Sequence, residues 1–485
     1  MKVLFVQESA LDESQALFDL AALLESRGHA VTMLLDREET ALPAVAQQLR
    51  PDLALVTCSM LNHGWAREIA GRVRAATGAP VLLGGTAPTL FPDGLRGIAA
   101  DALVRGEAEG PVLSVLDMLG RGGRLRDCDG APGLAFETDA GFTGTDPVAP
   151  FDLSALPLAS KDPLYGRYPF LRAFPFKRFL ASRGCHHRCT YCYMPSLNKL
   201  QPKWEGQRVR RKPPEHAVAE VAREKAQGPL HHVHFSDDLF TNDADWLRSF
   251  ASLYRREVGI PFTCNTSAEL IDDDVAESLA EAGCFAIGFA VETATARLRQ
   301  KVLRKGVTTD HFHRAAAALR KKGIQIGTFN MVALPGETPD EVIDTALLNA
   351  ELRSDFCRLN YAFPMPGTGM HDYAVTEGHL DADWTRRFWS PAFRYQQGPQ
   401  FSTPYEREFR NLFVMFRPLA RDRRLLPAVR RLVRAPTLGP LHRALTLQNA
   451  WSEKQQFRIP VVAGLKFFAK VGRPELRSTN FPALI

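Results

Sequence analysis

Two stretches of the chain alternate short apolar runs with amphipathic helical patterns, and this alternation limits the folds open to it. The first stretch covers residues 1–125, and its apolar runs are typical of buried parallel strands. A helical pattern over residues 14–27 places Leu17 and Leu24 on one face and ends at Gly28. Repeated strand–helix units of this length predict a parallel sheet covered by helices on both faces. We therefore expect an α/β, doubly wound, Rossmann-like N-terminal domain.

A second stretch with the same alternation covers residues 178–370. Its six strand–helix units predict a partial (β/α)6 barrel of the TIM type, with functional groups at the carboxyl ends of the strands. Residues 126–177 contain many prolines and predict a connector, with a turn over residues 139–144. The alternation fades after the barrel, so we expect a mainly helical C-terminal region over residues 371–485. The expected barrel strands cover residues 179–182, 232–236, 262–267, 286–291, 324–332 and 357–363.

Three of the eight cysteines, Cys185, Cys189 and Cys192, follow the first expected barrel strand. Their C-x3-C-x2-C spacing lets one short loop turn three thiolates toward one point. Thiolates are the usual protein ligands of iron–sulfur clusters, and three of them leave one iron of a [4Fe–4S] cubane open. His186 and His187 suggest zinc, but neither has the paired spacing of a structural zinc site. Three close cysteines cannot all form disulfides, and chance clustering is the remaining alternative.

The motif resembles that of the radical S-adenosylmethionine (SAM) enzymes, in which an aromatic residue, here Tyr191, precedes the third cysteine. The resemblance implies that the open iron binds the amino and carboxylate groups of SAM. It also implies that one electron, from a donor such as flavodoxin or ferredoxin, cleaves SAM to methionine and a 5′-deoxyadenosyl radical. That radical abstracts hydrogen from the substrate. On this resemblance Cys185, Cys189 and Cys192 are both the metal ligands and the catalytic residues.

Polar residues stand at the ends of later strands, in the order in which the radical SAM family places its SAM contacts. The resemblance implies that Asp237 and Asp238 meet the SAM amino group, because a carboxylate suits an ammonium group. It implies that Glu292 accepts hydrogen bonds from the ribose hydroxyls and that Pro335, in Leu-Pro-Gly-Glu-Thr, lies near the adenine. A helix cap is the alternative for one of the aspartates, and a solvated surface carboxylate is the alternative for Glu292.

Loops after the N-terminal strands are where a doubly wound sheet binds its ligand. The runs Val81-Leu-Leu-Gly-Gly-Thr-Ala-Pro and Arg105-Gly-Glu resemble the cobalamin-binding domain that precedes many radical SAM domains. The resemblance implies cobalamin contacts at the ends of the third, fourth and fifth strands, from Thr57, Ser59, Leu61, Gly84, Gly85, Thr86, Gly106 and Glu107.

The loop over residues 7–12 departs from the cobalamin mutases, whose Asp-x-His-x-x-Gly motif supplies a histidine to cobalt. Without that histidine we expect base-off cobalamin with no imidazole beneath the cobalt, and Leu61 or Asn62 near that face. His63 is a candidate ligand, but an ordinary surface histidine is the simpler interpretation. A sheet that has lost cobalamin or binds another ligand is the alternative for the whole domain.

Both resemblances imply a cobalamin-dependent radical SAM enzyme, and the expected reaction is methyl transfer to an unactivated carbon of a small-molecule substrate. One SAM would methylate cob(I)alamin, and a second SAM would supply the radical that activates the substrate. The alternatives are a rearrangement or cyclisation without methyl transfer, and a non-catalytic iron–sulfur binding protein. A methylthiotransferase fits less well, because no additional N-terminal cysteine triad is visible.

The composition, with 45% hydrophobic and 24% charged residues, is that of an ordinary soluble protein. No signal peptide and no run of about 18 apolar residues is visible, so we expect a reduced, cytoplasmic protein. A net charge of +6 makes no case for nucleic acid. Residues 405–485 contain 16 Lys and Arg against 5 Asp and Glu, and a basic amphipathic helix there can contact a membrane surface or be merely solvated. The aromatic residues of 388–409 favour packing over a substrate channel.

Overall fold

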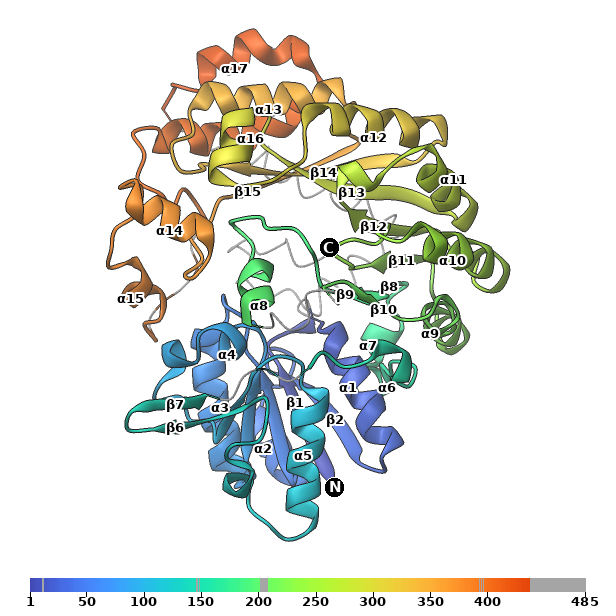
Figure 1. The fold of residues 1–485 in the computed structure, drawn as a ribbon, viewed down its shortest axis with the longest axis vertical. Coiled ribbons are helices and arrows are strands. Elements are labelled where there is room, and N and C mark those ends of the chain that lie inside the picture. The colour runs from blue at the N-terminus through green and yellow to red at the C-terminus, as the bar shows by residue number, and fades with distance from the viewer. Residues whose placement is uncertain are drawn as a thin grey trace.

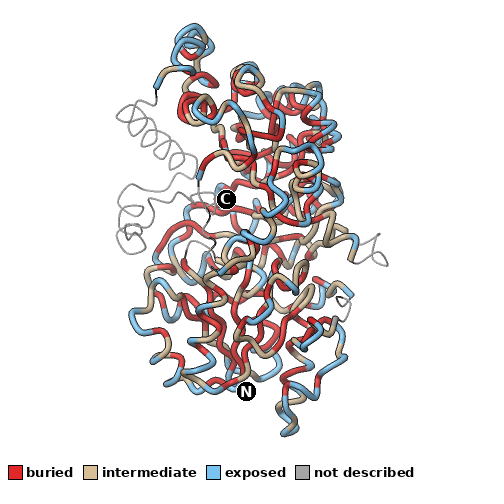
Figure 2. Tube along the Cα trace, turned by 90° about the vertical axis from the view of Figure 1, so that its left-hand side faces the viewer, coloured by how far each residue is buried: buried red, intermediate tan, exposed pale blue. Residues whose placement is uncertain are grey.

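The computed structural model describes residues 1–436 apart from 11–12, 145–146, 148, 201–207, 392, 394 and 396. Two large sheets form two α/β units, and Figure 1 shows them one above the other with helix α8 (Met194–Leu200) between them. Buried segments run through both units in Figure 2. No described helix is long and apolar enough to cross a membrane.

The N-terminal unit alternates strands and helices along most of its length. Its elements are β1 (Lys2–Gln7), α1 (Gln15–Ser26), β2 (Ala30–Leu35), α2 (Leu42–Leu49), β3 (Leu53–Thr57), α3 (His63–Thr77), β4 (Val81–Gly84), α4 (Thr86–Leu90), β5 (Ala102–Val104), α5 (Glu109–Gly120), β6 (Leu134–Thr138) and β7 (Gly141–Gly144). The sheet order is β2-β1-β3-β4-β5-β6-β7, and β1 to β5 are parallel because a helical crossover joins each to the next. This confirms the predicted doubly wound α/β domain.

Strands β6 and β7 extend this sheet and run antiparallel to their neighbours. The turn between them covers only residues 139–140, so the predicted turn over residues 139–144 is too long. Gly141 already belongs to β7, because Phe142 pairs with Glu137 across the hairpin. The N-terminal sheet therefore includes residues that the sequence pattern assigns to the connector.

The strand order changes direction between β1 and β3, and ligands of such sheets bind there, outside the carboxyl ends of the strands. We call the loops after β3, β4 and β5 (residues 58–62, 85–86 and 105–108) the switch-point edge. The backbone N–H of Met60 donates to Thr86 Oγ1 at 3.3 Å, which ties two of these loops together. Gly85 has φ 127°, and a Cβ there would lie 2.5 Å from the Cys58 carbonyl oxygen, so only glycine fits.

The second unit, which we call the barrel unit, is the predicted partial barrel. Its elements are β8 (Phe176–Phe179), α9 (Pro214–Gln227), β11 (His232–Phe235), α10 (Ala244–Glu257), β12 (Phe262–Thr266), α11 (Asp273–Ala282), β13 (Cys284–Glu292), α12 (Thr309–Lys321), β14 (Gln325–Val332), α13 (Pro339–Glu351) and β15 (Phe356–Tyr361). The six strands are parallel in the order β8-β11-β12-β13-β14-β15. Among the described residues β8 and β15 do not pair with each other, so the sheet is a curled half-barrel.

The first barrel strand ends earlier than predicted, at Phe179, whereas the expected strand covers residues 179–182. Asp237 accepts hydrogen bonds from the N–H of Ala181 at 3.1 Å and from Ser182 Oγ, which hold this segment away from the sheet. Ser182 and Arg183 then form β9 (Ser182–Arg183), which pairs antiparallel with β10 (Arg210–Arg211). The cysteine loop (residues 184–193) therefore leaves this β9–β10 ribbon and not a barrel strand.

The connector packs against the N-terminal unit. Its helices are α6 (Asp162–Tyr165) and α7 (Pro169–Arg172). Tyr165 of α6 and Phe176 of β8 share a core cluster with Phe18 of α1. This core is continuous from the N-terminal sheet through the connector to the first barrel strand.

The C-terminal region is helical where it is described, with α14 (Gly369–Thr376), α15 (Trp384–Phe388), α16 (Glu406–Arg421) and α17 (Leu426–Leu432). Phe416 of α16 packs with Ile343 of α13 and Leu359 of β15. Phe388 lies fully buried in a core cluster of the N-terminal unit, and Phe409 is buried beside α13. These contacts confirm that the aromatic residues pack. Residues 437–485 of the basic region lie outside the described residues.

His63 is completely buried, so its interpretation as a surface histidine is wrong. Its ring centroid lies 5.1 Å from that of Phe388, 5.0 Å from that of Trp389 and 5.8 Å from that of Phe393. These three rings come from the C-terminal region. The sequence around His63 could not indicate that they cover it.

We expect Gly85→Ala to lower the free energy of unfolding by about 1–3 kcal/mol, because its backbone conformation is strained for alanine and the Cβ would collide with Cys58. The control is Gly78→Ala, at φ 67° with no heavy atom within 4 Å of the added Cβ, which isolates the cost of positive φ. Urea unfolding measures both variants. Equal losses would show that the close approach to Cys58 has no effect.

Candidate active site

The three cysteines lie together on the cysteine loop. Burial, with smaller contributions from the Asp238 carboxylate and the neighbouring thiols, raises the pKa of Cys185 to about 12. Burial likewise raises the pKa of Cys192 to about 11 and that of Cys189 above its usual value. Three thiolates in such surroundings need cations to balance their charge, and the irons of a bound cluster would provide them.

The three thiols of the cysteine loop are the donor type that iron–sulfur clusters use. No three His, Cys, Asp or Glu side chains among the described residues converge on a point that could hold one metal ion. Zinc needs four ligands around one centre, whereas the cysteines of a cubane bind different irons and stay farther apart. The Nε2 of His187 lies 3.2 Å from Glu269 Oε1, so this histidine anchors the loop to the barrel unit.

Backbone contacts also fix the cysteine loop. The N–H of Thr190 donates to the carbonyl of Leu303 at 3.0 Å. The Nδ2 of Asn198, on α8, donates to the carbonyl of Cys185 at 3.1 Å. The positions of the three thiols are therefore set by the barrel unit on one side and by α8 on the other.

The two aspartates after β11 differ in what they contact. The carboxylate of Asp237 is buried and bound by Ala181 and Ser182. Asp238 is exposed and has no hydrogen bond to another described residue, yet burial of its carboxyl and the charge of Asp237 raise its pKa to about 6. Its charge also acts on Cys185. Of the two aspartates, Asp238 is therefore the one that is able to bind an ammonium group beside the cluster. This contact stays a prediction.

Glu292 ends β13 with φ 63°, a conformation that non-glycine residues rarely adopt. It is 4% exposed, so its interpretation as a solvated surface carboxylate is wrong. The hydroxyl of Tyr191 donates to Glu292 Oε1 at 2.7 Å, and Lys305 Nζ lies 3.3 Å from that hydroxyl and 3.7 Å from Oε1. These contacts join the aromatic residue of the cysteine motif to the end of the fourth barrel strand. The ribose contact of Glu292 stays a prediction.

Pro335 lies on the loop between β14 and α13, next to a buried carboxyl group. Oε2 of Glu337 accepts from the N–H of Leu334 at 3.0 Å, and Oε1 is buried with no partner among the described residues. Burial raises the pKa of Glu337 to about 8, so the group is mostly protonated at neutral pH. The loop is therefore held from within by a carboxylic acid, and the adenine contact of Pro335 stays a prediction.

Most of the expected cobalamin contacts lie on or beside the switch-point edge. The N–H of Gly106 donates to Thr89 Oγ1 at 3.0 Å, which fastens the loop after β5 to α4. Leu61 is 39% exposed at this edge, an unusual position for a large apolar side chain, and it suits contact with a flat hydrophobic ligand. The residues brought together here are Thr57, Ser59, Leu61, Gly84, Gly85, Thr86 and Gly106. Their contacts with cobalamin stay predictions.

Glu107 belongs to a different set of contacts. Its carboxylate lies 3.5 Å from Arg183, accepts from Arg210 Nη1 at 3.2 Å and accepts from the N–H of Phe151 at 2.7 Å. It therefore links the switch-point edge to the β9–β10 ribbon.

Three further residues that join the two units, Asp19, Arg183 and Lys212, were not predicted as site residues. On a helical wheel Asp19 lies away from the face that holds Leu17 and Leu24, so no local signal marked its burial. Asp19 lies 2.7 Å from Arg183 and 2.7 Å from Lys212, and contacts between residues so distant in sequence leave no local pattern.

Comparison with known proteins agrees with these features. Residues 179–348 match the family model of the radical SAM superfamily, and residues 14–116 match the model of the B12 binding domain. The chain contains a B12-binding domain followed by a radical SAM domain. A [4Fe–4S] cluster, SAM and cobalamin are the cofactors that these two domains imply.

The relatives of this chain are distant. It is 27% identical over 284 residues to an uncharacterised methyltransferase of Pyrococcus horikoshii, covering 58% of this chain and 59% of the relative. It is 24% identical over 210 residues to the cytidylyl-2-hydroxyethylphosphonate methyltransferase of Streptomyces wedmorensis, covering 42% of this chain and 38% of the relative. The matches thus span less than two thirds of the length of either relative.

The fold is also found in a solved structure. The radical SAM methyltransferase TsrM from Kitasatospora setae superimposes with a TM-score of 0.64 and 20% identity, covering 78% of this chain and 76% of that chain. This likeness concerns the arrangement of the two units.

We expect Glu337→Gln to remove a pH dependence of stability. Because the folded state raises the pKa of Glu337 to about 8, stability is greatest below the ordinary glutamate pKa and falls as the pH rises through the folded value. The variant should therefore gain melting temperature over the wild type near pH 9 and gain little near pH 5. The control is Glu351→Gln, an exposed carboxylate at the end of α13. Equal shifts at both pH values would contradict the burial of this charge.

We expect Glu292→Gln to weaken SAM binding by about 1–3 kcal/mol, the effect of losing a charge-assisted hydrogen bond, and to leave the iron content unchanged. Tyr191→Phe keeps the carboxylate and removes only the bond between the two side chains, so it separates positioning from direct contact. Equilibrium dialysis of SAM against the reconstituted variants measures both effects. Unchanged SAM affinity in Glu292→Gln would place the ribose contact elsewhere.

Proposed function

We propose that this chain is a cobalamin-dependent radical SAM methyltransferase that methylates an unactivated carbon of a small molecule. The observation that carries this proposal is the closeness of the cysteine loop and the switch-point edge. Arg183, two residues before Cys185, lies 3.5 Å from Glu107 and 2.8 Å from Glu109, both just after β5. A reaction that uses two cofactors on one substrate needs their sites side by side.

A second contact supports the same closeness. Phe91, which follows α4, packs so tightly on Gly367 that a Cβ at residue 367 would lie 2.0 Å from the phenyl ring. Ser196 of α8 donates to the carbonyl of Gly367 at 3.0 Å. The N-terminal unit, α8 and the loop after β15 therefore meet at one place.

The chain's own residues would hold and orient the reacting groups. When bound, the cluster with SAM supplies hydrogen abstraction from carbon, and cobalamin supplies a methyl group that a carbon radical can accept. In this proposal Asp238 binds the SAM ammonium group, and the hydrogen bond of Tyr191 to Glu292 holds the loop next to Cys192. A donor such as flavodoxin or ferredoxin would supply the electron.

The barrel lumen is the substrate site in this proposal. Val233 and Phe235 of β11 pack against the outer helices, so the alternating residue Ser236 faces the lumen, as Asn265 does beside it. Ser236 Oγ is buried with no hydrogen-bond partner among the described residues. Polar lumen groups of this kind suit a small substrate that carries its own hydrogen-bonding groups.

The names of three relatives support methyl transfer. The two curated relatives described above are both called methyltransferases, and so is TsrM. The compounds named for two of them, a cytidylyl phosphonate and tryptophan, differ from each other. The proposal for this chain therefore names the reaction and a small-molecule substrate, without choosing between such compounds.

We expect the anaerobically reconstituted protein to hold about four irons per chain and to form 5′-deoxyadenosine when SAM and a reductant are added. It should also form S-adenosylhomocysteine, which reports methylation of cobalamin and separates methyl transfer from a rearrangement. Cys189→Ala should abolish deoxyadenosine and keep cobalamin, because only the cluster is changed. Cys128→Ala, a buried cysteine of the N-terminal unit, should keep both products.

Liquid chromatography with mass spectrometry measures these products. Deoxyadenosine at the wild-type rate in Cys189→Ala would refute the cluster assignment. Deoxyadenosine without S-adenosylhomocysteine would favour a rearrangement or cyclisation.

A further inference from the structure

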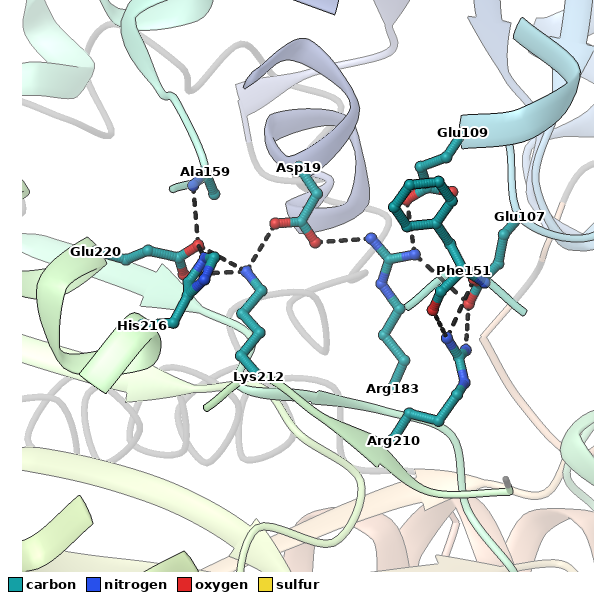
Figure 3. A network of polar contacts seen from close by, with 10 residues as sticks. All are labelled: Asp19, Glu107, Glu109, Phe151, Ala159, Arg183, Arg210, Lys212, His216 and Glu220. Atoms are coloured by element: carbon teal, nitrogen blue, oxygen red, sulfur yellow. Dashed lines mark hydrogen bonds and ion pairs between the residues drawn. The ribbon is translucent and has the colours of Figure 1, made fainter. Parts of the chain in front are cut away.

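A network of charges, drawn in Figure 3, joins the two units. Its Arg183 stands two residues before Cys185 in the chain. The network combines carboxylates of the N-terminal unit, cations on or beside the β9–β10 ribbon, and one carboxylate of α9. We call this set the interdomain network, and its members are Asp19, Glu107, Glu109, Arg183, Arg210, Lys212 and Glu220.

Arg183 contacts three carboxylates of the N-terminal unit. Its guanidinium lies 2.7 Å from Asp19, 2.8 Å from Glu109 and 3.5 Å from Glu107. Burial alone would lower the pKa of Arg183. The three carboxylates outweigh this effect and raise the pKa above its ordinary value, so the group stays charged. A guanidinium suits this place because its rigid fork of donors serves several acceptors in fixed directions.

Lys212 extends the network into the barrel unit. Its Nζ lies 2.7 Å from Asp19 and 2.8 Å from Glu220 of α9. Burial alone would raise the pKa of Glu220, but Lys212 and hydrogen bonds from its neighbours lower it to about 2. Asp19 is thus held by Arg183 of β9, which precedes the cysteine loop, and by Lys212, which follows β10. Removing either cation would leave a buried charge short of a partner.

Strand β9 leads into the cysteine loop, and β10 ends the longer segment that begins with this loop. We call the chain at these two strands the stems. Arg183 pairs with Arg210 across the ribbon, and the N–H of Lys212 donates to the carbonyl of Ala181 at 2.8 Å. Gly184 has φ 99°, and a Cβ there would lie 2.0 Å from a carbonyl oxygen of the opposite stem. The two stems therefore touch where the loop begins, and the interdomain network holds both of them.

We propose that Arg183 is a positioning residue that fixes the cysteine loop against the switch-point edge and thereby sets the separation of the cluster from cobalamin. The identity of the second cofactor rests on the proposed function, whereas the link between the loop and the edge rests on the contacts above. An ion pair that only stabilised the fold would not couple these two places. Here one guanidinium contacts the carboxylates that follow β5 and stands two residues before the first cysteine.

The first test uses the full chain without added cofactors. Arg183→Met removes the charge and keeps much of the side-chain volume. The control, Arg74→Met, removes an ion pair of 3.0 Å to Asp101 inside the N-terminal unit. We expect Arg183→Met to speed hydrogen exchange several-fold both at the start of α5 and across the β9–β10 ribbon, and Arg74→Met to change neither. Unchanged exchange at both places would overturn the link.

The second test uses reconstituted protein with a reduced cluster and cob(II)alamin. A fast-relaxing paramagnet such as a reduced iron–sulfur cluster speeds the relaxation of a slower one nearby, so electron paramagnetic resonance of cob(II)alamin reports the separation of the cofactors. Arg183→Met should keep iron and cobalamin but lose most of the relaxation enhancement, whereas Arg74→Met should keep it. Wild-type relaxation in folded, loaded Arg183→Met would overturn the proposal.

A conservative variant covers the case in which Arg183→Met does not fold. Arg183→Lys keeps the charge and loses the fork, so it should fold and show an intermediate enhancement. Wild-type enhancement in Arg183→Lys would then overturn the role of the fork. Absence of cobalamin from the wild-type protein would instead contradict the proposed function, and the exchange test would still decide the role of Arg183.

Discussion

Burying charged side chains is costly unless each finds an opposite charge and hydrogen bonds within reach, and the contact between the two units depends on this condition. Asp19 is 1% exposed on a helix face that otherwise packs in the core. Arg183 and Lys212 both reach it. If the units slid past one another, Asp19 would be left buried without a cation. The electrostatic cost therefore favours one register of the units, and the places of the cysteine loop and the switch-point edge follow from it.

Within the barrel unit, polar groups at the strand ends have mainly structural partners. Asp237 holds the segment that leads to β9, and Glu292 holds Tyr191 of the cysteine loop. Glu292 and Ala333, at the ends of neighbouring strands, both have positive φ. Such backbone conformations persist only where the surrounding contacts determine them. Glu292 and the segment bound by Asp237 are therefore positioned by contacts within the protein, whereas Asp238 of the candidate SAM site is exposed.

The N-terminal unit is completed by the far end of the described chain. Phe388 and Trp389 cover His63, and a Cβ at Gly94 would lie 2.4 Å from the ring of Trp389. Without this segment the apolar side chain of Phe91 and the ring of His63 would face water. The N-terminal unit thus depends on the C-terminal region for part of its core.

The sequence by itself determined the elements and the chemistry of the cluster. Strand and helix periods are local, so both α/β units and the order of their strands along the chain could be read from apolar spacing. One exception is the first barrel strand, which was expected over residues 179–182 and ends at Phe179. Another is the hairpin of β6 and β7, where Gly141 and short strands hide the pattern. The three cysteines could be read as a cluster site because ligands so close in sequence must also be close in space.

Only the tertiary structure decided which of these polar residues are free to bind a ligand. In the tertiary structure Asp237 is bound by the backbone, whereas Asp238 is exposed. His63 is buried, and Glu107 takes part in an ion-pair network. These outcomes depend on partners that are distant in sequence, such as Asp19 and Arg183. The burial and charge of a group come from everything that packs around it, and no local pattern records that.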